Sequence, residues 1–310
     1  MTQDQTVVVT GAAGFIGSNL VPELLKLSHS VLVLDNFSNS SRDSLPQSPD
    51  VSIQEGDICN YQDVVDCVKD TEVVFHMAAQ VGNVLSMERP RTDLETNVVG
   101  TINLLQACQE QNVKQIILSS SSAIFGETQY VPVDEDHPMN PMSPYGLSKY
   151  AAERYCLILG AEYGLRIACL RYFNVYGALQ RFNPYGNVLP IFAEKALQGE
   201  PLTIYGDGEQ TRDFIDVRDI VRANILAMGH QANGVFNIGT GVATTVNQLT
   251  KSVIGASNQG LKIQYAPSRS GEVLHSVANI EKANRELEFY PSVSIDDGVR
   301  NYLDWFASSK

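Results

Sequence analysis

Through its first half the chain alternates short apolar segments with segments of helical periodicity. The apolar segments are rich in Val and Ile and almost continuous, as in strands that are buried on both faces of a parallel sheet. The segments between them space their apolar residues as amphipathic helices do. This alternation predicts an α/β fold with a doubly wound parallel sheet. The expected strands are residues 6–10, 30–35, 51–54, 72–78, 115–120 and 166–173, and the expected helices are residues 15–27, 60–70, 93–111 and 143–164.

One residue conflicts with this pattern. Pro22 falls inside the helix that is expected at residues 15–27. A proline inside a helix lacks one hydrogen-bond donor and crowds the preceding turn, which costs about 3 kcal/mol or kinks the helix. We therefore expect a kink or a loss of stability at this point.

After Gly177 the alternation becomes less regular. Residues 178–190 and 206–214 are rich in Gly, Pro and polar side chains, as loops over a ligand cleft are. Further helices are expected at residues 190–200, 217–230 and 295–309, and a strand at residues 234–241. The change predicts a sheet domain of residues 1–177, with returning segments around 213–247, and a smaller interleaved domain formed mainly by residues 178–310.

The charge of the chain restricts its partners. Its 310 residues include 35 acidic side chains against 22 Lys and Arg, a formal net charge of −13. Such a charge disfavours binding to a nucleic-acid backbone. Hydrophobic residues make up 44% and charged residues 18%, as in an ordinary globular protein. No apolar run approaches the roughly 20 residues of a membrane helix, so we expect no membrane partner.

The cysteines, the histidines and the first residues indicate the compartment. The five cysteines form no CxxC pair, which is typical of reduced thiols in a cytoplasmic protein. The five histidines are isolated from one another, and none sits at metal-ligand spacing with a Cys or carboxylate cluster, so no metal site is expected. The opening residues, MTQDQTVVVT, have no basic stretch leading into a long apolar one. We therefore expect a cytoplasmic protein without a signal peptide.

A glycine-rich turn follows the first expected strand. In VVVTGAAGFIGS, Gly11, Gly14 and Gly17 lie between that strand and the first helix. Glycine permits a tight turn and lets backbone N–H groups approach a pyrophosphate, which the helix N-terminus also attracts. Asp35 ends the second strand, where a carboxylate can accept both ribose hydroxyls and repel a 2′-phosphate. The pattern predicts a dinucleotide site that takes NAD rather than NADP.

Further cofactor contacts are expected at the ends of the next strands. Asp57 and Ile58 follow the third strand, where they can cover an adenine ring, and the small Ala78 and Ala79 after the fourth strand let a cofactor lie close to the backbone. His76, at the end of the fourth strand, is interpreted as a packed histidine rather than a catalyst. The remaining expected cofactor contacts are Phe15, Ile16, Asn36 and Asn97.

The segment SPYGLSK carries candidate catalytic residues. Ser143 can cap a helix whose first residue is Pro144, so that Tyr145 and Lys149 share one face of its first turns. A phenol titrates near pH 10. A nearby ammonium and the positive helix end are expected to lower the pKa of Tyr145, so that it can take a hydroxyl proton while hydride leaves the same carbon.

Together these motifs resemble the extended short-chain dehydrogenase/reductase family and, within it, the UDP-sugar 4-epimerases. The resemblance covers nearly the whole chain. It rests on TGAAGFIGS, LDNFSNS, GDICN, FHMAA, NVVGT, SSSSAIFG, SPYGLSKYAAE, LRYFNVYG, IYGDGEQTRDFIDVRDI, NIGTG and RSGE, in family order. It implies a Rossmann domain that binds NAD and a C-terminal domain that binds the nucleotide sugar. Tyr145 and Lys149 are expected to contact the NAD as well.

The resemblance also assigns roles near the serine run. It implies that Tyr145 is the base and that Lys149 positions the tyrosine and the nicotinamide ribose. Counting back from IFG, it places a hydroxyl that binds the reacting oxygen at Ser121; Ser122 or Ser120 could share this role. Dehydratases of the family carry an acid directly after that hydroxyl, and decarboxylases tend to have a Glu in the turn. Here Ser122 and Ala123 stand instead, which leaves epimerisation or simple dehydrogenation.

For the nucleotide sugar the resemblance implies one set of contacts. Asn174 and Asn187 would meet the diphosphate or sugar, Tyr205 would stack on uracil, and Glu272 would take the ribose hydroxyls. Arg212 and Arg269 would clamp the diphosphate, because a guanidinium pairs two oxygens at once. Each has a simpler structural interpretation: Arg212 could form a surface ion pair with Asp213, and Asn174 could be a loop residue.

Sugar choice is assigned to one position. The residue that gates the space beside C2 in the family corresponds by counting to Ser276, next to His275. A bulky aromatic residue there blocks an N-acetyl group, whereas serine leaves room. The expected substrates are therefore UDP-Glc/UDP-Gal and also UDP-GlcNAc/UDP-GalNAc.

Two other functions are considered. One is a UDP-glucuronate 4-epimerase, in which Arg181 or Arg89 would serve the C6 carboxylate. The other is a non-catalytic regulator that binds a dinucleotide. Such family members usually lose the tyrosine or the lysine, whereas this chain keeps Ser121, Tyr145 and Lys149. The long helices of residues 93–111 and 143–164 resemble the pair that forms a four-helix contact in the family, so a homodimer is expected.

Overall fold

The central element is a seven-stranded parallel sheet. The structure, a computed structural model, describes residues 5–183, 186–257, 259–268 and 273–310. The strand order is β11-β6-β5-β4-β1-β2-β3, and each neighbouring pair is parallel. The strands are β1 (Thr6–Thr10), β2 (Ser30–Asp35), β3 (Val51–Glu55), β4 (Val73–His76), β5 (Gln115–Ser121), β6 (Arg166–Tyr172) and β11 (Gly234–Ile238). The expected doubly wound α/β fold is confirmed.

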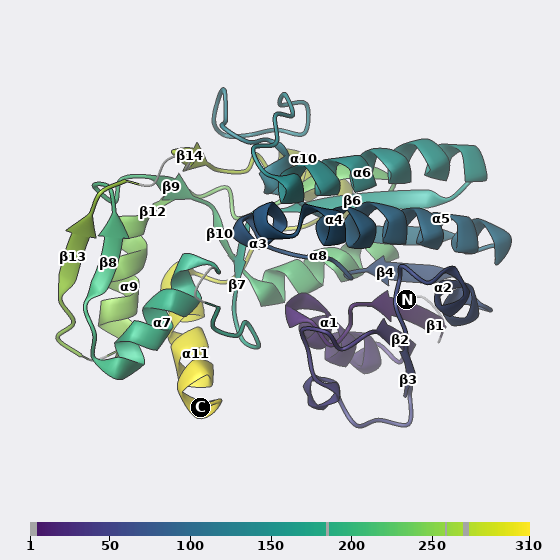
Figure 1. Cartoon of the computed structure of the whole chain (residues 1–310), viewed down its shortest axis with the longest axis horizontal. Helices are drawn as coiled ribbons and strands as arrows, with labels where there is room; N and C mark the ends of the chain where they lie inside the picture. The colour runs from purple at the N-terminus through teal and green to yellow at the C-terminus, as the bar shows by residue number, and fades with distance from the viewer. Residues whose placement is uncertain (1–4, 184–185, 258, 269–272) are drawn as a thin grey trace.

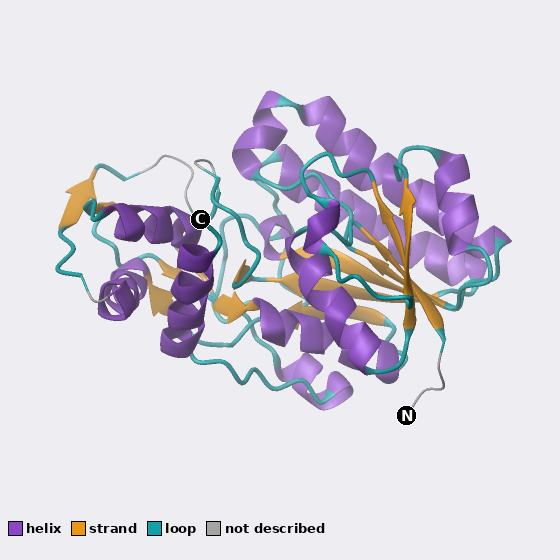
Figure 2. Ribbon diagram, turned by 90° about the horizontal axis from the view of Figure 1, so that it is seen from below, coloured by secondary structure: helices purple, strands orange, loops and turns teal. Residues whose placement is uncertain are grey.

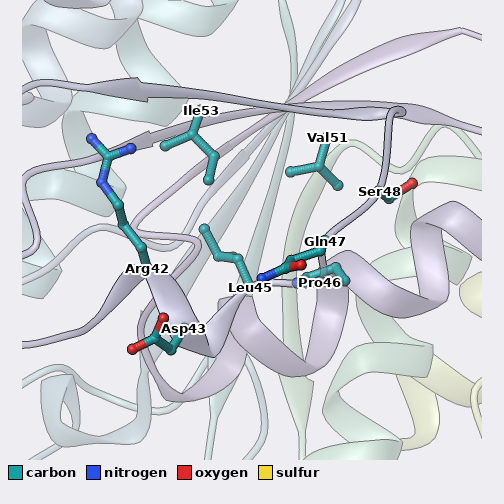
Figure 3. Close-up of a pocket in the computed structure, with 8 residues that line it drawn as sticks. All are labelled: Arg42, Asp43, Leu45, Pro46, Gln47, Ser48, Val51 and Ile53. Atoms are coloured by element: carbon teal, nitrogen blue, oxygen red, sulfur yellow. The ribbon is translucent and has the colours of Figure 1, made fainter.

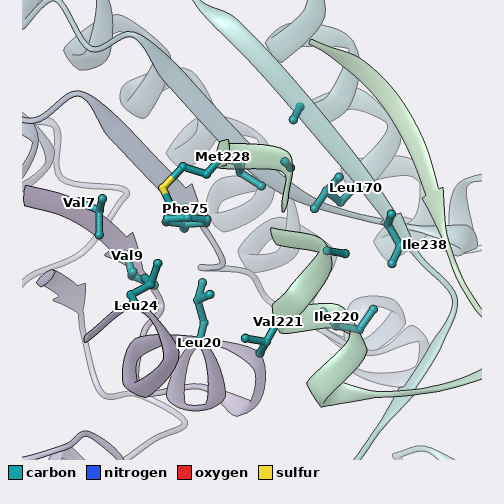
Figure 4. Close-up of a cluster of buried hydrophobic side chains, with 14 of the residues drawn as sticks. Val7, Val9, Leu20, Leu24, Phe75, Leu170, Ile220, Val221, Met228 and Ile238 are labelled. Atoms are coloured by element: carbon teal, nitrogen blue, oxygen red, sulfur yellow. The ribbon is translucent and has the colours of Figure 1, made fainter. Parts of the chain in front are cut away.

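Helices cover both faces of this sheet (Figure 2). One face carries α1 (Phe15–Lys26), α8 (Val217–Gly229) and α10 (Glu281–Leu287). Figure 4 shows their contact with the sheet, where Leu20 and Leu24 of α1 and Val221 of α8 lie with Val9 of β1 and Phe75 of β4 in one buried cluster. Burial of this apolar surface holds the helices on the sheet.

The opposite face carries α2 (Tyr61–Val68), α5 (Gly100–Glu110) and α6 (Pro144–Tyr163). Val64, Leu104 and Cys156 from these helices pack with Val8 and Ile116 of the strands. Four of the five cysteines belong to this cluster, where they are buried and form no disulfide bond. The fifth, Cys59, is exposed.

Two details differ from the sequence expectations. The helix expected at residues 93–111 is divided into α4 (Pro90–Leu94), a π-helical turn η2 (Glu95–Val99) and α5. Strand β3 is exposed at Ser52 and Ile53 rather than buried on both faces, because it forms the sheet edge. As expected, helix α1 includes Pro22 and ends at Lys26; the kink or loss of stability expected from the proline stays a prediction.

The second half of the chain builds a smaller lobe and returns twice to the sheet (Figure 1). Buried side chains of α7 (Val188–Gln198), α9 (Val246–Ser257) and α11 (Ile295–Ser308) form the core of this lobe. Beside them β8 (Leu202–Tyr205) pairs with β13 (Ile263–Ala266). Between excursions into this lobe, the chain contributes α8, β11 and α10 to the large one. This agrees with an interleaved arrangement; the residue boundaries of the two domains stay a prediction.

Short strands join the two lobes. Strand β9 (Thr211–Arg212) lies between β12 (Thr244–Thr245) and β14 (His275–Ser276), and β10 (Phe214–Asp216) pairs with β7 (Asn174–Tyr176). The segment 206–214, expected as a loop, therefore contains β9 and the start of β10. The other short elements are η1 (Arg42–Ser44), α3 (Asn83–Glu88) and η3 (Ser122–Ile124).

Candidate active site

The glycine-rich turn between β1 and α1 is packed too tightly for side chains. Gly11 has φ +65°, and a Cβ added to it would lie 2.6 Å from the Cα of Ala78. A Cβ on Gly17 would lie 2.6 Å from the Cα of Ala12. Gly14, the N-cap of α1, offers no side chain to the first N–H groups of that helix. The turn thus leaves these donors, and the positive helix end just before Phe15 and Ile16, to an anion.

Asp35 connects this turn to the loop after β2. Its Oδ2 accepts a 2.9 Å hydrogen bond from the N–H of Ala13. Its Oδ1 accepts hydrogen bonds from the N–H of Phe37 (2.8 Å) and the hydroxyl of Ser40 (3.1 Å). A carboxylate has about four acceptor sites, so this one keeps capacity for one further donor. The contact of Asp35 with the ribose hydroxyls stays a prediction.

Asp57 lies in a polar cluster after β3. It accepts hydrogen bonds from the N–H of Cys59 (2.8 Å) and the amide of Asn36 (2.9 Å). Burial raises the pKa of the Asp57 carboxyl, but these two donors outweigh burial and the net pKa is lowered. Ile58 is buried against Gly100, where an added Cβ would meet its side chain at 2.6 Å. An ionised acceptor thus lies next to an apolar side chain, as an adenine site requires.

His76 is a packed core residue. Its two ring nitrogens lie 2.8 Å from the hydroxyl of Thr10 and 3.0 Å from that of Thr101. Burial, with the charge of Lys149, lowers the pKa of His76 to about 3. The ring is therefore neutral at physiological pH. The neighbouring backbone continues to Ala78 and Ala79 beside Gly11, which is where a cofactor could approach closely.

Asn97 holds two parts of the protein together. Its carboxamide oxygen accepts from the N–H of Gln80 (2.8 Å). Its NH₂ group faces the carbonyl of Gln80, the carboxylate of Asp93 and the hydroxyl of Ser148, at 3.0–3.1 Å. Two N–H bonds facing three acceptors leave no donor for a ligand. These contacts favour a positioning role for Asn97, and its expected contact with the cofactor stays a prediction.

The candidate catalytic side chains meet at the first turn of α6. Ser143 caps the helix by accepting from the N–H of Gly146 (3.1 Å), and Pro144 is its first residue. Tyr145 is half-buried, and Ser121, at the end of β5, is close enough to its phenol to lower the pKa of that group. Lys149, one turn further along, is 4% exposed. Strand end and helix start thus bring the three residues into one place.

The expected lowering of the Tyr145 pKa is wrong for the protein alone. Burial raises the pKa of the phenol, the charge of Asp93 raises it further, and the nearby hydroxyl of Ser121 opposes both. Burial also lowers the pKa of Lys149 to about 8, against the opposing effects of nearby thiols and carboxylates. The prediction from the sequence did not include this desolvation, because the motif does not show how deeply Tyr145 and Lys149 are buried.

The four serines at the end of β5 have different partners. Ser119 lies near the phenol of Tyr172, whose pKa it lowers against the effect of burial. Ser120 is buried and donates a 2.7 Å hydrogen bond to Glu153. Ser121 meets Tyr145 and also accepts from the N–H of Ala123 (3.2 Å), and Ser122 begins η3. Ser120 is therefore turned away from the candidate site, which corrects the idea that it could share the role of Ser121.

The expected substrate residues are partly brought together. Arg212 and Ser276 are register partners in β9 and β14, and the N–H of Asn174 donates to the carbonyl of Asp213 (2.9 Å). Half-buried Tyr205 ends β8, and exposed Asn187 precedes α7. The hydroxyl of Thr128 donates to the carbonyl of His275 (2.7 Å), so the loop after Ser121 meets β14. Arg269 and Glu272 lie outside the described residues.

Three buried carboxylates lie near the site; the sequence analysis missed two of them and considered the third, Asp213, only as a surface ion-pair partner of Arg212. Asp93 lies near Lys149, and its pKa is raised by burial against the effects of Ser148 and Lys149. Glu153 binds Arg171 through a 2.6 Å ion pair, and Asp213 joins several backbone segments. Only Glu153 carried a signal, its helical spacing of four residues from Lys149.

A separate cavity of about 420 Å³ lies between η1 and β3 (Figure 3). It contains no residue of the candidate site. Its lining is Arg42, Asp43, Leu45, Pro46, Gln47, Ser48, Val51 and Ile53. Among the described residues no group of three or more His, Cys, Asp or Glu is placed to hold a metal ion. In the same part of the chain, every helix is too short or too polar to span a bilayer.

Comparison with known proteins identifies the family. Residues 7–239 match the NAD dependent epimerase/dehydratase family. The chain is 38% identical over 309 residues to a putative UDP-glucose 4-epimerase from Methanocaldococcus jannaschii, covering 98% of this chain and 99% of that one. It is 33% identical to a UDP-N-acetyl-alpha-D-glucosaminuronate decarboxylase from Bacillus cytotoxicus, covering 96% and 97%.

A solved structure agrees with this result. The UDP-N-acetylglucosamine 4-epimerase from Methanobrevibacter ruminantium M1, in complex with UDP-N-acetylmuramic acid, superposes with a TM-score of 0.96 at 35% identity and full coverage of both chains. The tight glycine turn, the uncapped N-terminus of α1 and the acceptors at Asp35 and Asp57 fit a dinucleotide. The chain therefore belongs to the NAD dependent epimerase/dehydratase family and is an NAD-dependent enzyme.

Proposed function

We propose that the protein interconverts the C4 epimers of UDP-hexoses: UDP-Glc with UDP-Gal and, as a second pair, UDP-GlcNAc with UDP-GalNAc. The observation that carries the proposal is the meeting of Ser121, Tyr145 and Lys149 at the end of β5 without a carboxylate at positions 122 or 123. This set can remove and return a hydroxyl proton, but it has no acid to expel water from the sugar.

Each side chain has one task in this proposal. The hydroxyl of Ser121 holds O4 of the sugar, and the phenolate of Tyr145 takes the O4 proton as the C4 hydride leaves. NAD, if held by the turn at Gly11, Gly14 and Gly17, would supply the hydride acceptor and a positive ring whose charge would favour the phenolate. Lys149, as an ammonium, also favours the phenolate. After the 4-keto sugar turns over, Tyr145 returns the proton as the hydride returns to the other face, so the net redox change is nil.

The diphosphate and uridine are assigned to the second lobe. Arg212 and Arg269 would pair with the diphosphate, and Asn174 and Asn187 would contact the diphosphate or sugar. Tyr205 would stack on uracil, and Glu272 would bind the ribose hydroxyls. In support, Arg212, Ser276 and the backbone of Asn174 lie in adjoining strands at the junction of the lobes.

The second candidate is C4 epimerisation of UDP-glucuronate. One relative is named a UDP-N-acetyl-alpha-D-glucosaminuronate decarboxylase. Its substrate has a C6 carboxylate, which is the reason to consider such a substrate here. Arg181 donates to the hydroxyl of Ser44 (3.4 Å), and Arg89 lies between α3 and α4. Both residues are exposed, and neither is tied to the Tyr145 site by these contacts. The retained Tyr145 and Lys149 likewise disfavour a non-catalytic regulator.

One assay separates these functions. Purified protein is incubated separately with UDP-Glc, UDP-GlcNAc and UDP-GlcA, and the sugar products and released carbon dioxide are measured. We expect epimers of the first two substrates, without carbon dioxide and without net NADH. Turnover of UDP-GlcA alone would overturn the proposal, and protein that holds NAD but converts none of the three would indicate a regulator.

A further inference from the structure

Asp213 forms a buried junction beside the proposed substrate site. Its side chain is fully buried. Oδ1 accepts hydrogen bonds from the N–H and the hydroxyl of Thr240, both at 2.7 Å. Oδ2 accepts from the N–H groups of Gly241 (2.9 Å) and Ala278 (3.2 Å). All four donors are neutral, and each would be left without this acceptor if the carboxylate were lost, which is costly for buried groups.

The junction connects three segments that are far apart in the sequence. The main-chain carbonyl of Asp213 accepts from the N–H of Asn174 (2.9 Å). Arg212 directly precedes Asp213. Ser276 lies two residues before Ala278 and is the register partner of Arg212. The three residues assigned to the nucleotide sugar are therefore all close to Asp213 along the chain or through its bonds. Asn174 is bonded to it, Arg212 precedes it, and Ser276 lies two residues before Ala278, which is bonded to it.

Gly239 keeps this junction compact. A Cβ added to Gly239 would lie 2.5 Å from Oδ2 of Asp213 and 2.8 Å from the Cβ of Ala278. Both contacts are shorter than real Cβ contacts, so a side chain at this position would displace the carboxylate or the strand. Gly239 thus gives a second way to disturb the junction, one that leaves the charge of Asp213 unchanged.

We infer that Asp213 is a positioning residue for nucleotide-sugar binding, which holds Asn174, Arg212 and Ser276 in register without touching the substrate. The inference rests on the proposed function, since that proposal assigns the three residues to the substrate. It differs from a general stabilising role, because it places the effect in the binding step and not in chemistry or cofactor retention.

A second buried aspartate provides a matched control. Asp219, in α8, is 1% exposed. It accepts from the N–H and hydroxyl of Ser292, from the N–H of Val293 and from the guanidinium of Arg222, at 2.9–3.1 Å. It therefore resembles Asp213 in burial and number of donors, but its partners include no residue assigned to NAD or substrate.

The experiment compares Asp213→Asn with Asp219→Asn. In each variant the new NH₂ group faces N–H donors, so both junctions are weakened without a change of shape. The measurements on the NAD-loaded protein are UDP affinity by calorimetry, KM and kcat for the epimerisation, NAD content and the thermal midpoint. We expect Asp213→Asn to weaken UDP binding and raise KM about tenfold or more. Its kcat and NAD content stay near the wild-type values, and Asp219→Asn loses stability only.

Two outcomes would overturn the inference. One is UDP affinity within about twofold of wild type in Asp213→Asn, and the other is an equal loss of affinity in Asp219→Asn. If Asp213→Asn does not fold, Gly239→Ala decides the same question, with weakened UDP binding in support and unchanged binding against. Arg212→Ala separates this inference from the proposed function: unchanged UDP affinity there would remove the substrate assignment itself.

Discussion

Ser120 and Glu153 are joined by a 2.7 Å hydrogen bond in which the buried hydroxyl donates to the carboxylate. The same carboxylate forms a two-pronged ion pair with Arg171 of β6. Successive side chains of a strand point to opposite faces, so the bond that turns Ser120 toward Glu153 leaves Ser121 facing Tyr145. The ion pair holds the Glu153 carboxylate in place, and its bond to Ser120 thus leaves Ser121 as the hydroxyl that enters the candidate site.

This relationship predicts unequal effects for neighbouring serines. Ser121→Ala should lower kcat about 10²-fold, because it removes a hydroxyl that holds the reacting oxygen. Ser120→Ala should leave kcat within about threefold and lower the thermal midpoint, because a buried acceptor loses one donor. Steady-state kinetics and thermal unfolding of the two variants provide the check. Equal losses of kcat would contradict the assignment.

Replacement of Tyr145 tests the proposed base. Tyr145→Phe keeps the ring but removes the only hydroxyl that is placed to exchange the O4 proton in our proposal. We expect kcat to fall by about 10³-fold or more, with NAD content close to that of the wild type. The measurement is conversion of UDP-Glc in a coupled assay, beside extraction and quantification of NAD. Undiminished conversion of every nucleotide sugar tested would end the scheme.

Lys149 should reduce the stability of the fold at neutral pH. Its pKa falls from 10.5 to about 8 by burial, so between these pH values the unfolded chain binds a proton that the folded chain does not. Stability therefore rises with pH across this window, and below pH 8 the full cost of burial, on the order of 3 kcal/mol, is present. We expect Lys149→Met to be inactive yet to unfold at a higher temperature than wild type at pH 7.

The control is the pH dependence of that difference. Unfolding of NAD-free wild type and Lys149→Met should be compared at pH 7 and at pH 10. The gap in unfolding free energy should narrow toward pH 10, because the wild-type lysine is then neutral in the folded protein. A gap that is independent of pH would show that packing and not charge distinguishes the two proteins.

Ser276 is predicted to set the size of the substituent at C2. A Ser276→Tyr variant should lose at least about tenfold in kcat/KM for UDP-GlcNAc and retain most of its activity on UDP-Glc, because the ring would fill the space of the N-acetyl group. Both substrates are assayed on the same preparation. Loss of both activities, or of neither, would refute the assignment of this position.

The outer face of α4, η2 and α6 is predicted to form a homodimer. Leu94, Val99, Leu147, Tyr155 and Ile158 are large apolar side chains that are exposed on these elements. A patch of this kind on helices is typical of a protein interface. Light scattering should give a dimer mass at micromolar concentration, and Ile158→Glu should give a monomer. A monomeric wild-type protein would contradict the prediction.

The central sheet could be predicted from the sequence because each inner strand is buried on both faces. An almost continuous apolar run such as QIIL of β5 has few other places in a soluble fold. The short strands β9, β12 and β14 gave no such signal. Each has two residues and exists because segments around Arg212, Thr244 and Ser276 meet in space, which local sequence does not encode.

The candidate site was predictable where it depends on local motifs. Ser143 and Pro144 start α6 as expected, so the spacing of Tyr145 and Lys149 also fixes their common face. The direction of the Tyr145 pKa was not predictable, because burial and the charge of Asp93 come from the assembled protein. The role of Ser120 depended in the same way on Glu153, a residue 33 positions away.

Strand β11 completes the sheet on the far side of β6, although the chain forms α7, β8 and α8 between these two strands. During synthesis the outer edge of β6 therefore stays unpaired until Gly234–Ile238 have left the ribosome. An unpaired strand edge invites pairing with other chains. A nascent chain halted shortly after β6 would thus carry all the proposed catalytic residues on an incomplete sheet with one open edge.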